Sequence, residues 1–197
     1  IGSSSARGEP RPMPAFRRQW RAPIVARQGR SIRSALARSL KLDTRLPWLL
    51  FYPGNLGFPF DWQALRAARA LFLVFAPPPR PVENVISLAG VRVRHQDVVA
   101  SVDGAIAKPG YGIVGECLAC RTPLLYIERE RFAEYDAMDR ALQSWGGAIR
   151  AAPGDFLSGE WLRKLERLLR LRPARPAGLD GASAIAAKLT AMALTAC

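Results

Sequence analysis

The chain has 197 residues, of which 49% are hydrophobic and 23% charged, and its 29 Lys and Arg against 16 Asp and Glu give a formal net charge of +13. This much apolar surface excludes a disordered chain, three cysteines are too few for a disulfide framework, and no run reaches the roughly 18 apolar residues of a membrane-spanning helix. The charge leaves three anionic partners open: nucleic acid, a membrane surface and a phosphorylated ligand.

The positive charge is concentrated at the start of the chain. Residues 1–46 carry eleven basic side chains against Glu9 and Asp43, a net charge of +9, whereas residues 47–197 carry +4. The first twelve residues contain turn formers and no apolar period, which predicts an extended or disordered segment. Ile1 in place of a methionine indicates a fragment. We therefore divide the chain into a basic arm or interdomain connector, residues 1–46, and one α/β domain, residues 47–197.

From residue 47 onward, short apolar runs alternate with helical patterns. The apolar runs predict six strands, at 47–51, 71–75, 85–88, 104–107, 124–127 and 148–150. Helical patterns lie at 61–68, 95–101, 111–120, 134–145 and 162–169, and a last helix follows Asp180. Continuous apolar strands separated by helices predict a Rossmann-like parallel sheet with helices on both faces. Ligands of such sheets bind at the loops that follow the strands.

The loop after the fourth predicted strand carries the strongest chemical signal. It reads Lys108-Pro109-Gly110-Tyr111-Gly112 and opens a helix. Glycines at a helix start allow a ligand to approach the backbone, and the first N–H groups with the helix dipole suit a diphosphate. Glu116, one turn further, could accept hydrogen bonds from the adjacent hydroxyls of a ribose. A tight turn with a surface glutamate explains the same spacing equally well, and Lys108 could face either a phosphate or water.

A longer segment around this loop resembles a known family. Residues 108–136, KPGYGIVGECLACRTPLLYIERERFAEYD, resemble the signature of bacterial proteins related to family 28 glycosyltransferases. Similar segments form the N-terminal part of sugar kinases of the L-arabinokinase type. The resemblance extends to PIVARQGR at 23–30 and LLFYPGNLG at 49–57. It implies the C-terminal, donor-binding half of a GT-B glycosyltransferase, which transfers a sugar from a nucleotide diphosphate, UDP above all, to an acceptor hydroxyl.

The resemblance also assigns residues to a binding site. The turn Gly110-Tyr111-Gly112 and Glu116 would hold the diphosphate and the ribose, and His95 lies where relatives contact the base. A first loop facing the phosphates would contain Gly54, Asn55 and Gly57, and Glu134 and Tyr135 would lie near the donor sugar. Pro53 departs from the usual glycine and removes a backbone donor from that first loop.

The family's N-terminal acceptor domain, which usually supplies the catalytic base, is not among these 197 residues. We therefore assign no catalytic residue and leave open whether the chain alone is an enzyme.

Other residues with chemical potential favour plainer interpretations. His95 and Asp97 could form a general base, but no nucleophile is spaced around them, so we favour a backbone-directed contact at a helix start. Cys117 and Cys120 lie within an apolar helical stretch, and a zinc site would need two further ligands. We interpret them as buried, reduced thiols, in agreement with a cytoplasmic protein. We expect nucleotide-sugar binding without a metal or another cofactor.

Two other functions stay open from the sequence. One is a non-catalytic nucleotide-binding or regulatory module associated with a sugar kinase. The other is a basic nucleic-acid-binding protein, for which only bulk charge speaks, since no zinc-finger or RNP-like pattern is present. The leucine stripe at 162–169 is predicted to face the core, although its basic side leaves peripheral contact with the inner face of a membrane open.

Overall fold

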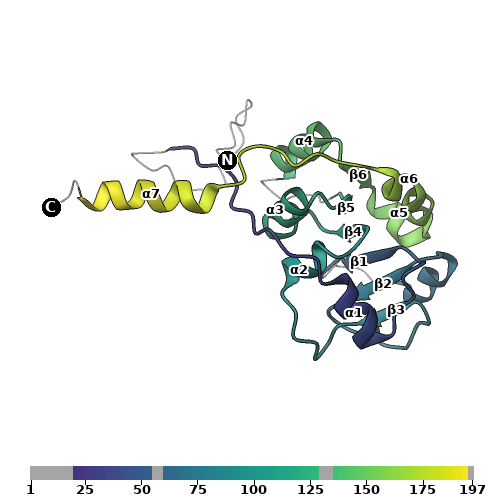
Figure 1. The fold of residues 1–197 in the computed structure, drawn as a ribbon. Helices are drawn as coiled ribbons and strands as arrows, with labels where there is room; N and C mark the ends of the chain where they lie inside the picture. Colours follow the sequence, from purple (N-terminus) through teal and green to yellow (C-terminus); the bar gives the residue numbers. More distant parts are fainter. Residues whose placement is uncertain (1–19, 55–59, 129–134, 195–197) are drawn as a thin grey trace.

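The computed structural model describes residues 20–54, 60–128 and 135–194 (Figure 1). Three of the predicted site residues, Asn55, Gly57 and Glu134, lie outside these ranges. The strands form one sheet in the order β3-β2-β1-β4-β5-β6, and each neighbouring pair is parallel. They are β1 (Trp48–Tyr52), β2 (Leu71–Val74), β3 (Val85–Ser87), β4 (Gly104–Ala107), β5 (Leu124–Ile127) and β6 (Ala148–Ala151). All six strands expected from the sequence are thus present, with ends that differ by at most one residue.

Helices cover both faces of the sheet. One face is covered by α1 (Arg33–Leu40), α2 (His95–Val99), α3 (Tyr111–Cys120) and α4 (Tyr135–Trp145). The other is covered by η1 (Trp62–Ala67), α5 (Pro153–Ser158), η2 (Glu160–Lys164) and α6 (Leu165–Arg170). Successive strand residues point to opposite faces, so Trp48 and Leu50 join the first core and Leu49 and Phe51 the second. The predicted Rossmann-like α/β fold is confirmed.

Two predicted helices take a tighter form than expected. The pattern at 61–68 gives the 3₁₀ helix η1, capped by the Asp61 side chain, which accepts from Gln63 N at 2.9 Å. At the end of η1, the side-chain Nδ2 of Asn84 donates to three backbone oxygens, those of Leu65, Ala68 and Ala70. These hydrogen bonds hold the turn that leads directly into β2. The leucine stripe begins as the 3₁₀ helix η2 and continues as α6, and its buried Leu165 and Leu168 face the core as predicted.

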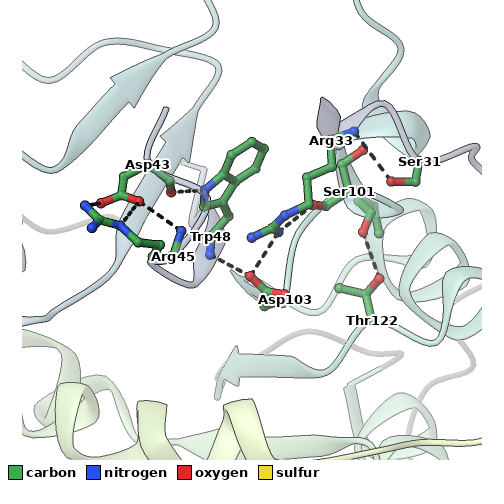
Figure 2. Close-up of polar contacts among 9 residues, drawn as sticks. Ser31, Arg33, Asp43, Arg45, Trp48, Ser101, Asp103 and Thr122 are labelled. Atoms are coloured by element: carbon green, nitrogen blue, oxygen red, sulfur yellow. Dashed lines mark hydrogen bonds and ion pairs between the residues drawn. The ribbon is translucent and has the colours of Figure 1, made fainter. Parts of the chain in front are cut away.

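Helix α1 lies within the segment that the sequence indicated as a connector. Its only buried residue is Leu36, with Ala37 and Leu40 partly buried against the core. Two arginines and two serines among its eight residues concealed this short helical period in a basic segment. The Arg33 guanidinium lies 4.2 Å from the centre of the Trp48 ring and donates to Ser101 O and Asp103 Oδ2, both at 3.0 Å (Figure 2). Asp103 also accepts from Trp48 N at 2.7 Å, so one network joins α1 to the starts of β1 and β4.

The segment before α1 runs in close backbone contact with α2 and α3. A Cβ on Gly29 would lie 1.8 Å from Gln96 O, and a Cβ on Gly115 would lie 3.2 Å from Val25 O. Val25 pairs with Asp180 in an isolated antiparallel bridge, so this segment also contacts the chain just before α7 (Gly181–Leu194).

Helix α7 extends away from the body of the domain (Figure 1). Its Leu189 and Met192 are exposed, and neither they nor Ile185 belong to either core. Across the described ranges, no helix is long and apolar enough to cross a membrane.

Candidate functional site

The strand order reverses between β1 and β4, and we call the space beyond the carboxyl ends of these two strands the candidate crevice. These strands are neighbours, but the chain leaves β1 toward β2 on one side and β4 toward β5 on the other. In open α/β sheets, ligands bind where the strand order reverses in this way. Gly54 follows β1 with a φ of +63°, a left-handed conformation that favours glycine, and Lys108 follows β4.

The start of α3 lies at this edge of the sheet. Gly110 is its N-cap in extended conformation, and no side chain caps the helix. A Cβ on Gly110 or Gly112 would meet no atom of the described residues within 4 Å. The packing of the described residues therefore does not require glycine here, and a ligand approaching the first N–H groups of the helix would account for it.

Glu116, one turn further along α3, is almost fully buried, and both of its oxygens are occupied. The side chain is 1% exposed; Arg27 Nη2 donates to Oε1 at 2.6 Å and His95 Nδ1 lies 2.5 Å from Oε2. A buried carboxylate requires compensation of this kind, since removing it from water costs several kcal/mol. In this conformation no ligand hydroxyl reaches Glu116 unless one of its partners moves.

His95 packs against two neighbouring aromatic rings. Phe75 stacks on the imidazole with ring centres 5.0 Å apart, and Tyr52 meets it edge-on at 4.8 Å. The Nδ1 atom of the ring faces Glu116 Oε2. The other nitrogen, Nε2, is buried and has no hydrogen-bond partner in the described part of the chain.

Asp97, considered as a partner for His95 from the sequence, faces other groups. It accepts from Arg30 N at 2.9 Å and from the Arg94 guanidinium at 2.8 Å. These hydrogen bonds, first the one from the Arg30 backbone, lower the pKa of Asp97. Asp97 therefore fixes the connector and the start of α2, and the carboxylate beside His95 is Glu116.

Tyr135 lies in a different polar group, at the start of α4. It is buried, its hydroxyl has no hydrogen-bond partner among the described residues, and burial together with the charge of Asp139 raises its pKa to about 12. Nearby, the Tyr126 hydroxyl donates to Asp139 at 2.5 Å and accepts from Gln143 at 2.7 Å.

The two cysteines of α3 are free thiols, as expected from the sequence. Cys117 is fully buried, which raises the pKa of its thiol, and Cys120 is partly buried. Within the ranges that the structure describes, no three side chains of His, Cys, Asp and Glu gather into a metal site.

The structure thus brings together some of the predicted residues and adds others. His95 and Glu116 are in contact, and Gly54, Lys108 and the Gly110–Gly112 turn follow the two strands that flank the crevice. Three contact residues were missed from the sequence: Arg27, Tyr52 and Phe75. Tyr52 and Phe75 lie at the ends of apolar runs, where the sequence indicates only strand residues. Arg27 is one of many arginines in a basic segment, so nothing in the sequence distinguishes it.

Comparisons with known proteins agree with this architecture. No family model matches the chain. In sequence it is 28% identical over 179 residues to the L-arabinokinase of Arabidopsis thaliana, a match that covers 86% of this chain and 17% of that protein. In structure it is similar to the calicheamicin glycosyltransferase CalG4, with a TM-score of 0.53 and 17% identity, over 66% of this chain and 35% of CalG4. A second similar structure is the glycosyltransferase SnogD from Streptomyces nogalater, with a TM-score of 0.49 and 16% identity, over 92% of this chain and 52% of SnogD.

The expected resemblance to glycosyltransferase-like proteins is therefore confirmed, and the domain has the Rossmann-like fold found in GT-B glycosyltransferases. The chain spans well under two thirds of each of these relatives, 17% of the L-arabinokinase and 35% of CalG4.

Proposed function

We propose that this chain is the nucleotide-diphosphate-sugar binding half of a family 28-like glycosyltransferase, with UDP as the preferred nucleotide. The observation that carries the proposal is the reversal of strand order between β1 and β4, beside which α3 starts without a side-chain cap from the described residues and continues to the buried Glu116. The α3 N-terminus would bind the diphosphate, Glu116 the ribose, and the aromatic surroundings of His95 the base.

The contribution of this half to catalysis would be electrostatic. Backbone N–H groups and the helix dipole would stabilise the charge that develops on the departing diphosphate during sugar transfer. The acceptor and the catalytic base would come from a second domain, as the coverage of 35% of CalG4 supports. Helix α7 supports such a partner too, because an apolar helix with little amphipathicity is normally covered by protein.

Calorimetry with UDP, GDP and ADP, each with and without Mg²⁺, tests the proposal. We expect UDP to bind with the highest affinity and Mg²⁺ to change that affinity little. Absence of binding at millimolar concentrations of all three nucleotides contradicts a donor site in this chain.

The role of Glu116 is tested in the same titration with Glu116→Gln. We expect UDP binding to weaken by about 1–3 kcal/mol, the usual range for losing a hydrogen bond to a charged group. Glu160→Gln removes an exposed glutamate that is paired with Arg163 on the surface, and it serves as the matched control. Equal affinities of the two variants would assign Glu116 a structural role only.

A second candidate function is a nucleotide-sensing module within a sugar-kinase polypeptide, which the similarity to L-arabinokinase favours. Both functions require nucleotide binding. The coding sequence on both sides of this chain distinguishes the two functions. An acceptor domain upstream favours the transferase, and a kinase domain downstream favours the sensor.

We also propose a cytoplasmic location, because Cys117 and Cys120 are free thiols and reduced cysteines are typical of that compartment.

A further inference from the structure

The ion pair between Arg27 and Glu116 joins the connector to the candidate site. Glu116 is the group proposed to bind the ribose, but its side chain is only 1% exposed and both oxygens already accept hydrogen bonds. A nucleoside can therefore reach Glu116 only by replacing Arg27 or His95.

The two partners differ in their freedom to move. His95 is 23% exposed and packs against the rings of Phe75 and Tyr52, so a new position would require these contacts to be lost. Arg27 is 65% exposed, and a guanidinium has five N–H donors, of which Glu116 takes one. On release, the Arg27 guanidinium would return to water, and the buried Glu116 would stay compensated because the ribose hydroxyls take over the lost hydrogen bond. Arg27 is therefore the partner of Glu116 that a nucleoside would replace.

The backbone on both sides of Arg27 is anchored. Val25 pairs with Asp180, and the close approach of Gly29 to Gln96 O leaves no room for displacement toward α2. Only the side chain of Arg27 can change position without undocking the connector.

A released Arg27 would lie close to the place proposed for the diphosphate. Glu116 lies four residues after Gly112, about 6 Å along the axis of α3. That distance is comparable to the length of an arginine side chain, and the planar guanidinium matches the oxygens of a phosphate with two parallel hydrogen bonds.

We propose that Arg27 exchanges partners when a nucleotide binds: the ribose hydroxyls replace it on Glu116, and its guanidinium then binds the diphosphate. This inference rests on the proposed function of the crevice. It makes Arg27 both a competitor of the nucleoside and a ligand of the phosphates. A purely structural Arg27, which only neutralises Glu116, would affect uridine and UDP alike.

The ratio of the UDP and uridine association constants measures the exchange. UDP affinity is obtained by calorimetry and uridine affinity by NMR titration, for the full chain and its variants. For Arg27→Ala we expect uridine to bind as tightly as before or more tightly and UDP to bind more weakly, so that the ratio falls about tenfold or more. Arg27→Gln, which retains a neutral donor for Glu116, is the second variant and should lower the ratio in the same direction.

Arg21→Ala is the matched control, because it removes the same charge from an exposed position of the same segment. Its ratio should stay within twofold of that of the unaltered chain. An unchanged ratio in both Arg27 variants overturns the exchange while leaving the proposed function intact. Failure of the unaltered chain to bind either UDP or uridine overturns the proposed function, and the exchange with it.

Discussion

At the scale of single residues, the carboxylates of the site are paired with residues from distant parts of the chain. Glu116 pairs with Arg27, 89 positions away, and Asp97 with the backbone of Arg30, 67 positions away. The short-range pattern of the sequence contains neither contact. Gly112 is a different case, since no atom of the described residues lies within 4 Å of the place of its Cβ, and a ligand at the start of α3 would explain the glycine.

Gly112→Ala should separate stability from binding. Alanine is the better helix former, so we expect the free energy of unfolding to stay unchanged or to rise by up to about 1 kcal/mol. The added methyl group would stand where the diphosphate approaches α3, so UDP affinity should fall about tenfold or more. Chemical unfolding and calorimetry measure the two effects.

Gly154→Ala is the control for this variant, because a Cβ on Gly154 also meets no described atom within 4 Å and the residue lies in α5. It should leave UDP affinity unchanged. A Gly112→Ala chain that binds UDP normally would indicate that the glycine serves only the turn.

Asp97 gives the fold a defined response to acid. Its pKa is lowered below 3.8 in the folded chain, so between that pKa and 3.8 the unfolded chain binds more protons than the folded one. Its contribution to stability is therefore complete above pH 3.8 and is lost as the pH falls through the folded pKa. Asp97→Asn should destabilise the chain by about 1–3 kcal/mol at pH 7 and flatten the acid limb of its stability profile.

Unfolding in urea at pH values between 2.5 and 7 checks this expectation. Parallel acid limbs for the two proteins would show that Asp97 does not produce the pH dependence.

At the scale of elements, the sheet is the part that the sequence predicts best. The four inner strands, β1, β2, β4 and β5, are short apolar runs with buried residues on both faces, and such runs are distinct from the amphipathic helices between them. Helix α1 was missed because its apolar side is short, consisting of Leu36 with the partly buried Ala37 and Leu40, and lies in a segment rich in arginine. The candidate site was predicted in part for the same reason: glycines and a glutamate mark a turn in the sequence, but the partners of Glu116 come from remote segments.

Arg33 is expected to hold α1 on the sheet. Its guanidinium covers the Trp48 ring and binds Asp103 and Ser101 O (Figure 2), so Arg33→Ala should lower the free energy of unfolding by about 1–3 kcal/mol. Arg38→Ala removes an exposed arginine from the last turn of the same helix and should change stability by less than about 0.5 kcal/mol. Equal losses in the two variants would contradict a specific role of Arg33.

At the scale of the whole molecule, α7 is separate from the two cores. Its residues after Gly181 are exposed or partly exposed, and none of them belongs to either buried cluster. A chain that ends at Ala184 retains the pairing of Val25 with Asp180, so its midpoint of thermal unfolding should stay within about 2 °C of that of the full chain. Differential scanning calorimetry measures it, and a drop of more than about 5 °C would show that α7 stabilises the domain.

The pairing of Val25 with Asp180 also bears on how such a domain is used in evolution. The backbone of Ile24 bonds to Gly178 and Gly181 as well, so the two chain segments that bound the domain lie side by side. A domain whose first and last segments are adjacent can be inserted between two neighbouring residues of a host polypeptide, because its two connections leave from the same place. The same unit can therefore be transplanted between polypeptides of different length and activity, or circularly permuted, without rethreading its sheet.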